Sequence, residues 1–311
     1  MQESKLIRTP SQATSASTST ADPTPFPWPT SGLSPLPWFP FTVASSRNTI
    51  AAAERIATRT ERAYWHLRKR LGALPRFRLL VLDRADWPRF ADRGEYGLSH
   101  FTARANLVVG SDPATAWHEV SRELDRRLPE RVGRELVRTL GPDPQHGNGA
   151  DLSLVAESLV AHDLARFLAD QRGARFAAPW LLHAFANYAL VSVLGETEPA
   201  ALHRLGALAQ AAHELAAQTL PVTLLAAPGR RLTPFDAVLV QLALTRAVYL
   251  AYAERGDAPL ASWFERACAA TAGPVIPDAD HELGRMLADD VHPALAELVT
   301  MAQRAAYDHA A

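Results

Sequence analysis

A change of hydrophobic pattern part-way along the chain limits its fold more than any other feature. Two stretches, Phe77 to Asp83 (FRLLVLD) and Ala105 to Gly110 (ANLVVG), are short, apolar and bounded by polar residues, as buried strands are. From residue 111 onward, apolar residues recur at helical spacing, and proline and glycine separate the segments. A few strands followed by helices predict an α+β domain that is mostly helical, with a small N-terminal β-sheet.

The N-terminal part of the chain has a composition of its own. A Ser/Thr/Ala tract leads into the proline-rich stretch PFPWPTSGLSPLPWFPF, residues 25–41. Proline removes amide donors and restrains the residue before it, so neither a helix nor a central strand is expected there. The early part is typical of disorder, and the aromatic part indicates either an extended strap lying on the domain or a tail that does not dock.

These patterns predict two regions. Residues 1–44 are expected to be a disordered proline and aromatic tail. Residues 45–311 are expected to form a single domain, with a helix and the small sheet in 45–110 and the helical part in 111–311.

Charge and cysteine content weigh against several functional classes. The 311 residues carry a formal net charge of −1, which gives no electrostatic reason to expect nucleic acid as a partner. Cys268 is the only cysteine, which excludes a disulfide framework and a cysteine-based zinc site. No secretory signal is recognised, and the apolar stretch 238–252 is too short and too polar to span a bilayer. We expect a cytoplasmic protein with no membrane partner, and its arginine and alanine usage is typical of a GC-rich bacterial genome.

Two neighbouring helices carry polar residues on their inner faces. In the helix expected over residues 151–171, the apolar stripe continues into His162 and Arg166, one turn apart. The next helix, which begins near Pro179, places His183 on its own apolar stripe. A buried imidazole or guanidinium needs a polar partner, so these residues indicate a polar site between the two helices.

This pair of helices resembles the metal-site region of gluzincin-type zinc metallopeptidases, specifically the bacterial peptidase MA-like proteins. SLVAHDLARFLADQ lies where those proteins have an HExxH helix, and PWLLHAFANYALVSVLGETEP lies where they carry W-L-x-E-x-x-A. In such a site two histidines and the glutamate of the second helix bind zinc, and the glutamate of HExxH activates the zinc-bound water. The resemblance covers roughly residues 75–255 and implies a zincin-type helical domain.

The diagnostic positions of that motif are altered in this chain. His162 matches the first histidine, and Asp163 occupies the position of the general base. Arg166 replaces the second histidine, His183 replaces the third ligand, and Trp180 matches the tryptophan of the second helix. An arginine puts a permanent positive charge where a dication would lie, so the degenerate HDLAR motif implies loss of zinc. We expect Arg166 to take over the charge of the metal and to pair with Asp163 or with another carboxylate.

The resemblance therefore implies an inactive metallopeptidase homologue that needs no cofactor. Asp163 and Arg166 are its remnant catalytic positions, and His162, His183 and Trp180 belong to a cleft that binds a peptide, a protein segment or a small molecule. Two alternatives stay open. The same residues could carry metal-free acid/base chemistry on a small substrate, or zinc could bind to a rebuilt site of His162 and His183.

Peptide recognition in this cleft would need a strand that binds the peptide and a segment that occupies the cleft, and the chain has a candidate for each. An extended peptide pairs with an edge strand, and the strand at 105–110 is the expected edge. The chain's own proline and aromatic strap is a candidate occupant.

The remaining histidines carry no shared geometry. His118 and Glu119 begin like HExxH, but the apolar residues of their helix predict that His118 faces solvent or the rim. His203 and His213 are ten residues apart, outside the spacing of one helical turn, and are expected at the rim or in solvent.

Overall fold

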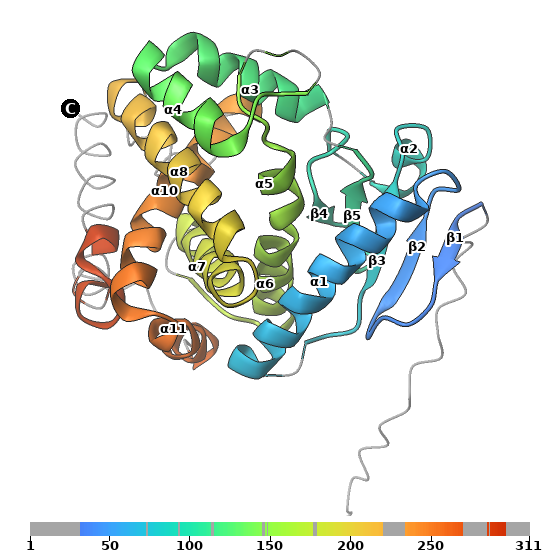
Figure 1. Ribbon diagram of the computed structural model, residues 1–311. Helices are drawn as coiled ribbons and strands as arrows, with labels where there is room; N and C mark the ends of the chain where they lie inside the picture. The colour runs from blue at the N-terminus through green and yellow to red at the C-terminus, as the bar shows by residue number, and fades with distance from the viewer. Residues whose placement is uncertain are drawn as a thin grey trace, which may run out of the picture. The chain divides into compact units, whose positions relative to one another are not determined.

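The computed structural model describes residues 32–296, except 73, 93, 113–114, 145–146, 148, 177–178, 220–233, 270–284 and 286. The disorder expected for the start of the tail, including Phe26 and Trp28, lies outside the described residues. Within them, the predicted class is confirmed: a small mixed sheet comes first and helices make up most of the remainder (Figure 1).

The sheet has five strands in the order β1-β2-β3-β5-β4. Its central strands β2, β3 and β5 are parallel, and the two edge strands pair antiparallel to their neighbours. Val43 is opposite Leu79, which is opposite Leu107, so one register runs across the three central strands. The strands are β1 Ser34–Leu36, β2 Thr42–Ser45, β3 Arg78–Leu82, β4 His100–Phe101 and β5 Asn106–Gly110.

The boundary predicted at residue 44 is wrong, because it falls inside a central strand of the sheet. The last prolines of the proline-rich stretch precede β2, and Pro35 lies in the edge strand β1, where a missing amide donor is tolerated. The Phe41 ring stacks on Phe77, with centroids 4.7 Å apart, whereas Trp38 is 93% exposed. The described end of the predicted strap is thus part of the domain.

The two faces of the sheet pack into different cores. Leu79, Val81 and Leu107 belong to the large core shared with the helices, and Leu80 and Val108 belong to a smaller cluster beside α2. This alternation follows from the two-residue period of a strand. Burial on both faces explains why β3 and β5 are continuous apolar runs in the sequence.

Helices dominate the described residues after 111, as predicted. The helix expected over 151–171 is divided at Leu159, whose amide bonds to the carbonyl of Ala156, three residues back. The helices are α1 Ile50–Leu71, α2 Trp87–Phe90, α3 Thr115–Arg127, α4 Glu130–Leu140, α5 Ser153–Ser158, α6 Val160–Gln171, α7 Pro179–Thr197, α8 Pro199–Thr219, α10 Pro234–Arg255, α11 Ala258–Ala269 and the π-helical turn η1 Leu287–Val291.

Helix α1 joins the sheet to the helical part. It contacts β2 and β3 as well as α6 and α7, and Figure 1 shows it between the strands and the other helices. The half-buried guanidinium of Arg59 bonds to Glu157 over 2.7 Å and to Glu198 over 2.9 Å, which ties α1 to α5 and to the junction of α7 and α8. Helix α7 packs against α6, α8 and α10 and is apolar on nearly all sides, as a central helix is expected to be.

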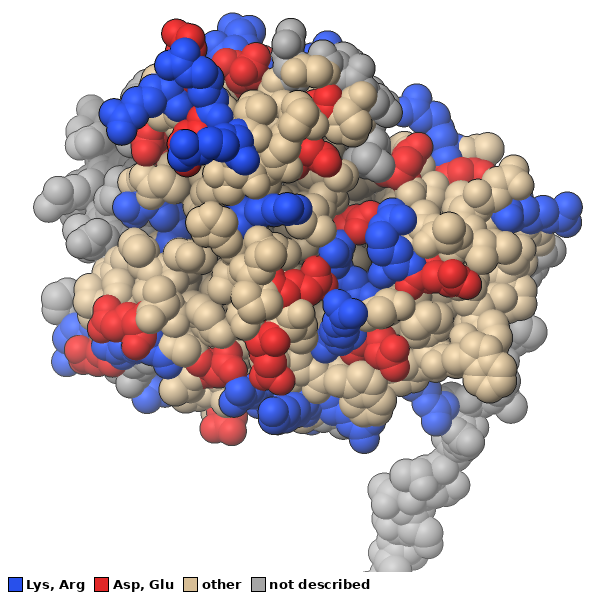
Figure 2. Space-filling view, in the orientation of Figure 1, with Lys and Arg blue, Asp and Glu red and all other residues tan. Residues whose placement is uncertain are grey.

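The described surface mixes charges of both signs. Figure 2 shows acidic and basic side chains close together over the visible face. None of the helices in the described ranges combines the length and the apolar character that a bilayer crossing requires.

Candidate functional site

Helices α6 and α7 bring the predicted site residues together. The His162 and His183 rings lie 5.8 Å apart between centroids, with an angle of 21° between their planes. The His162 and Asp163 side chains are each 8% exposed, whereas His183 and Arg166 are half-buried. We call these four residues the remnant site, after the expectation drawn from the sequence.

A hydrogen-bond chain fixes the orientation of His162. Asn187 of α7 donates from Nδ2 to the backbone carbonyl of Gln241 in α10, so its Oδ1 is free to accept. Gln241 Nε2 donates to that oxygen over 2.6 Å and lies 2.8 Å from His162 Nε2. Since Gln241 is the donor, His162 Nε2 accepts, and the proton of the neutral ring is on Nδ1.

Asp163 is engaged by two other groups. Its Oδ2 accepts a hydrogen bond of 2.6 Å from Ser99, and its Oδ1 lies 3.2 Å from His162 Nδ1. Arg166 forms no ion pair with Asp163 or with another carboxylate among the described residues, so the expected pairing is wrong. The serine hydroxyl and the protonated imidazole nitrogen already satisfy the carboxylate.

Arg166 and His183 each have a buried nitrogen without a hydrogen-bond partner among the described residues. These are Arg166 Nε and His183 Nδ1. Burial first, and then the neighbouring Arg166 and His162, lower the pKa of His183 to about 4. At neutral pH the pair is therefore one permanent cation beside a neutral imidazole.

The edge strand beside this site is not the predicted one. β5 lies between β3 and β4, so residues 105–110 are inside the sheet and the expected edge is wrong. The edge is β4, whose Phe101 stacks on Phe167 of α6, with centroids 4.0 Å apart and planes at 3°. Trp180 is only 7% exposed and belongs to the main core, so it does not form an open wall of a cleft.

The remnant site does not fit zinc. The lone pair of His162 Nε2 accepts from Gln241, and the Asp163 carboxylate is held by Ser99 and His162. The charge of Arg166 acts on the same His183 ring that would have to supply another ligand atom. A dication needs converging, deprotonated ligands and no adjacent cation. Here the ligand atoms of His162 and Asp163 are already hydrogen-bonded, and a permanent cation lies beside them.

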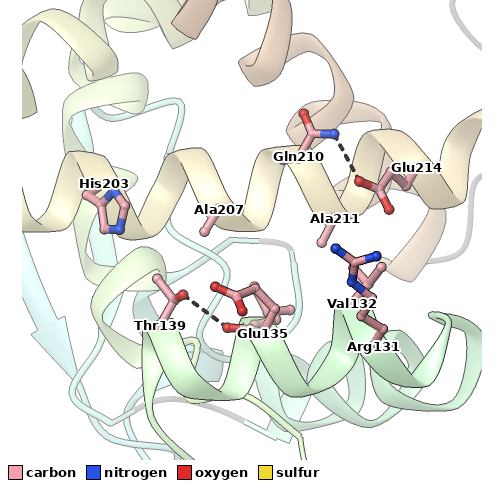
Figure 3. Close-up of a pocket in the computed structure, with 10 residues that line it drawn as sticks. Arg131, Val132, Glu135, Thr139, His203, Ala207, Gln210, Ala211 and Glu214 are labelled. Atoms are coloured by element: carbon pink, nitrogen blue, oxygen red, sulfur yellow. Dashed lines mark hydrogen bonds between the residues drawn. The ribbon is translucent and has the colours of Figure 1, made fainter.

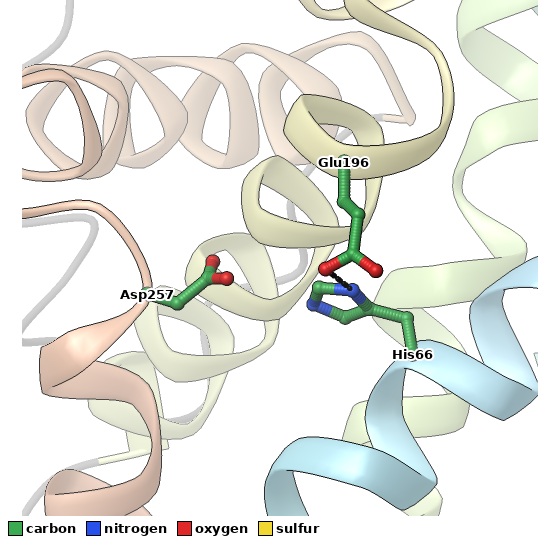
Figure 4. Close-up of side chains that lie close together, drawn as sticks. All are labelled: His66, Glu196 and Asp257. Atoms are coloured by element: carbon green, nitrogen blue, oxygen red, sulfur yellow. Dashed lines mark ion pairs between the residues drawn. The ribbon is translucent and has the colours of Figure 1, made fainter.

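A second polar group lies where α1 meets the end of α7 and the turn between α10 and α11. The ligand atoms of His66, Glu196 and Asp257 lie within 4.8 Å of one another, and Figure 4 shows the three side chains facing each other. We call them the carboxylate cluster. Sequence reasoning missed it, because its members are far apart in the chain and have no common spacing.

This cluster is not a serine nucleophile site, although Ser192 lies 2.7 Å from His66 Nε2. Ser192 is fully buried, and its hydroxyl donates to Asp257 over 2.5 Å. A nucleophile has to reach its substrate and pass its proton to the histidine, and neither condition holds here.

A groove of about 500 Å³ lies between α4 and α8 (Figure 3). His203 lines one end of it, and Arg131 and Glu214 line the other. The groove shares no residue with the remnant site. His203 is exposed and His213 half-buried, which agrees with the prediction for both.

The prediction for His118 is wrong. Its side chain is buried, and Nδ1 lies 2.9 Å from Asp143 in the loop after α4. Helix α3 therefore buries His118 beside Trp117. The partner, Asp143, lies outside this helix, so helical spacing could not identify it.

No protein-family model, curated protein or solved structure matches this chain.

Proposed function

We propose that the chain is a gluzincin-like metallopeptidase homologue that has lost zinc and peptidase activity and now binds a ligand at the altered site. The observation that carries this proposal is the stacking of His162 on His183, from the two helices that would hold a zinc ligand set, with a charged Arg166 beside them. In the peptidase motif those positions converge on one ion. Here the charge of the ion is replaced by the guanidinium, and its bond to the first histidine is replaced by Gln241.

The ligand is expected to carry a carboxylate. Arg166 Nε is a buried donor with no partner in the part of the chain that the structure describes, and the same holds for the neighbouring His183 Nδ1. Leaving such groups unpaired costs about 1–3 kcal/mol each. A ligand that forms hydrogen bonds with them removes this cost and gains that much binding free energy. A carboxylate accepts from the arginine and from a protonated Nδ1, and arginine binds carboxylates better than any other side chain does. The free end of a peptide and a small organic acid both provide this group.

Metal-free acid/base catalysis is supported less well. A general base works best with a pKa near the working pH, and a pKa of about 4 leaves His183 a weak base at neutral pH. His162 donates to Asp163 and accepts from Gln241, so both of its nitrogens are occupied.

Rebuilding the peptidase motif tests the ancestry. The triple variant Asp163→Glu, Arg166→His and His183→Glu restores HExxH and the third ligand. We expect it to bind one zinc ion more per chain than the wild type does, measured by plasma mass spectrometry, and to lose that ion on a further His162→Ala change. The matched control, Arg166→Gln, removes the charge without adding a ligand and should gain no zinc.

Two outcomes contradict this proposal. One is a folded triple variant whose zinc content equals that of the wild type. The other is zinc in the wild type that disappears in His162→Ala, which would identify a working site of His162 and His183.

Ligand binding is tested with a matched pair of peptides. Penta-alanine with a free C-terminal carboxylate and its amidated twin are titrated into the protein by calorimetry. We expect the free acid to bind at least about tenfold more tightly, since a charge-assisted hydrogen bond contributes about 1.5–3 kcal/mol. Arg166→Gln should remove the difference, and equal affinities of the two peptides for the wild type would sink the carboxylate assignment.

A further inference from the structure

The hydrogen bonds around Ser192 determine which nitrogen of His66 carries a proton. Ser192 Oγ donates its only proton to Asp257 Oδ1, because an ionised carboxylate can only accept. The contact of 2.7 Å between Ser192 Oγ and His66 Nε2 then requires an N–H at Nε2. A neutral His66 therefore presents a lone pair at Nδ1.

That lone pair faces a carboxylate. His66 Nδ1 lies 3.0 Å from Glu196 Oε2 but has no hydrogen-bond partner among the described residues, and the His66 side chain is only 1% exposed. Two acceptors at this distance repel each other, and a buried acceptor without a donor is costly. A cation shared by the two atoms removes both penalties.

We propose that His66 Nδ1 and the carboxylates of Glu196 and Asp257 bind a transition-metal dication of the zinc class. One imidazole nitrogen and two carboxylate oxygens suit zinc and its neighbours, whereas magnesium and calcium prefer oxygen alone. Neighbouring ligand atoms of a tetrahedral zinc lie about 3.3 Å apart when the bonds are about 2.0 Å long. The three ligand atoms already lie within 4.8 Å, so small side-chain rotations are sufficient.

The surroundings supply an entrance to the site and a competing cation. The Glu196 side chain is 43% exposed, so an ion can reach the cluster from solvent. Arg70 lies 2.5 Å from Asp257 Oδ2 and 3.6 Å from Glu196 Oε2, with its side chain 35% exposed. The guanidinium must swing outward when a metal ion binds. Arg70 thus neutralises the carboxylates in the absence of metal and lowers the affinity for it.

Titration of the metal-stripped full chain with Co²⁺ tests the proposal. Binding of one equivalent should produce the visible absorption bands of cobalt ligated by nitrogen and oxygen, and Zn²⁺ should displace the cobalt. We expect His66→Gln and Asp257→Asn each to weaken binding at least about tenfold, because each removes one of three ligands. Arg70→Gln should tighten it by about tenfold, since a nearby positive charge is lost.

Controls separate this site from the remnant site. His162→Ala should leave the cobalt affinity unchanged, so the result does not depend on the function proposed above. Circular dichroism shows whether each variant folds, and if His66→Gln does not, Glu196→Gln at its partly exposed position replaces it. The proposal is overturned if the wild type binds no cobalt at millimolar concentration, or if the folded His66→Gln and Glu196→Gln variants bind it as tightly as the wild type.

Discussion

The remnant site and the carboxylate cluster contain similar groups in opposite arrangements. Both depend on α7, and both place an imidazole next to an arginine. In the remnant site the nearby carboxylate is held by Ser99, and Arg166 is left beside two imidazoles. In the carboxylate cluster two carboxylates converge on one imidazole, and the arginine is their counter-ion.

The difference shows what determines whether a histidine site suits a metal ion. An imidazole with a bound amide donor has no lone pair to offer, as at His162. An imidazole whose lone pair faces a carboxylate leaves room for a cation between the two atoms, as at His66. The partner of the second ring nitrogen decides between the two cases, because it determines which nitrogen carries the proton.

The largest effect is expected when the hydrogen-bond chain of the remnant site is cut. Gln241→Leu leaves His162 Nε2 and Asn187 Oδ1 without a donor, and each unpaired buried acceptor costs about 1–3 kcal/mol. We therefore expect urea unfolding to show a loss of about 2–6 kcal/mol in the free energy of unfolding. Gln210→Leu on the exposed side of α8 is the control and should change it by less than about 1 kcal/mol. Equal losses of stability in the two variants would mean that the hydrogen bonds of Gln241 do not stabilise the site.

The next effect is a loss of stability in acid. His183 has a folded pKa of about 4, below its usual value, so in the window from about pH 6.5 to 4 the unfolded chain binds a proton that the folded chain does not. Folding stability therefore falls as the pH falls through this window, by at most about 3 kcal/mol from this group. Urea unfolding at pH 7, 5.5 and 4 measures it, and His183→Asn should remove most of this dependence.

His66 sharpens the comparison in the same experiment. Burial lowers its pKa too, but Glu196 and Asp257 act in the opposite direction. His66→Asn should therefore remove less of the acid sensitivity than His183→Asn does. A larger effect at His66 than at His183 would reverse the contrast drawn between the two sites.

The fold was largely predictable because its signals are local. The runs at 77–83 and 105–110 identify the two longest strands, and the helical spacing after residue 111 identifies the helices. The contribution of residues 34–45 to the sheet was not predictable, because three or four residues beside prolines carry too weak a pattern. The edge position was mistaken because β4 has only two residues and the order of the strands in a sheet is not a local signal.

The site was predictable only in part, because polar partners come from distant segments. His162 and His183 were found through helical spacing, and Asn187 follows His183 by one turn, so the same argument could have included it. Gln241 interrupts the apolar run 237–244, which is the kind of signal that indicates a buried polar contact, but nothing local connects it to His162. The contacts of Ser99, His66 and Asp257 join segments that are distant in the sequence. Residue spacing does not encode such tertiary contacts.

The smallest effect on stability and on cobalt affinity is expected for Lys69→Gln. Comparison with Arg70→Gln shows whether the position of a positive charge or only its presence controls the cobalt affinity. Lys69 Nζ lies 3.7 Å from Glu196 Oε1, and its side chain is 66% exposed. Exposed ion pairs contribute about 0–1 kcal/mol and are screened by salt, so Lys69→Gln should change the free energy of unfolding by less than about 0.5 kcal/mol. The same change should raise the cobalt affinity less than twofold, whereas Arg70→Gln, which removes the guanidinium bonded to Asp257, raises it about tenfold. If both variants tightened cobalt binding equally, the total positive charge around the carboxylate cluster would control the affinity, and Arg70 would not compete with the metal ion from within the site.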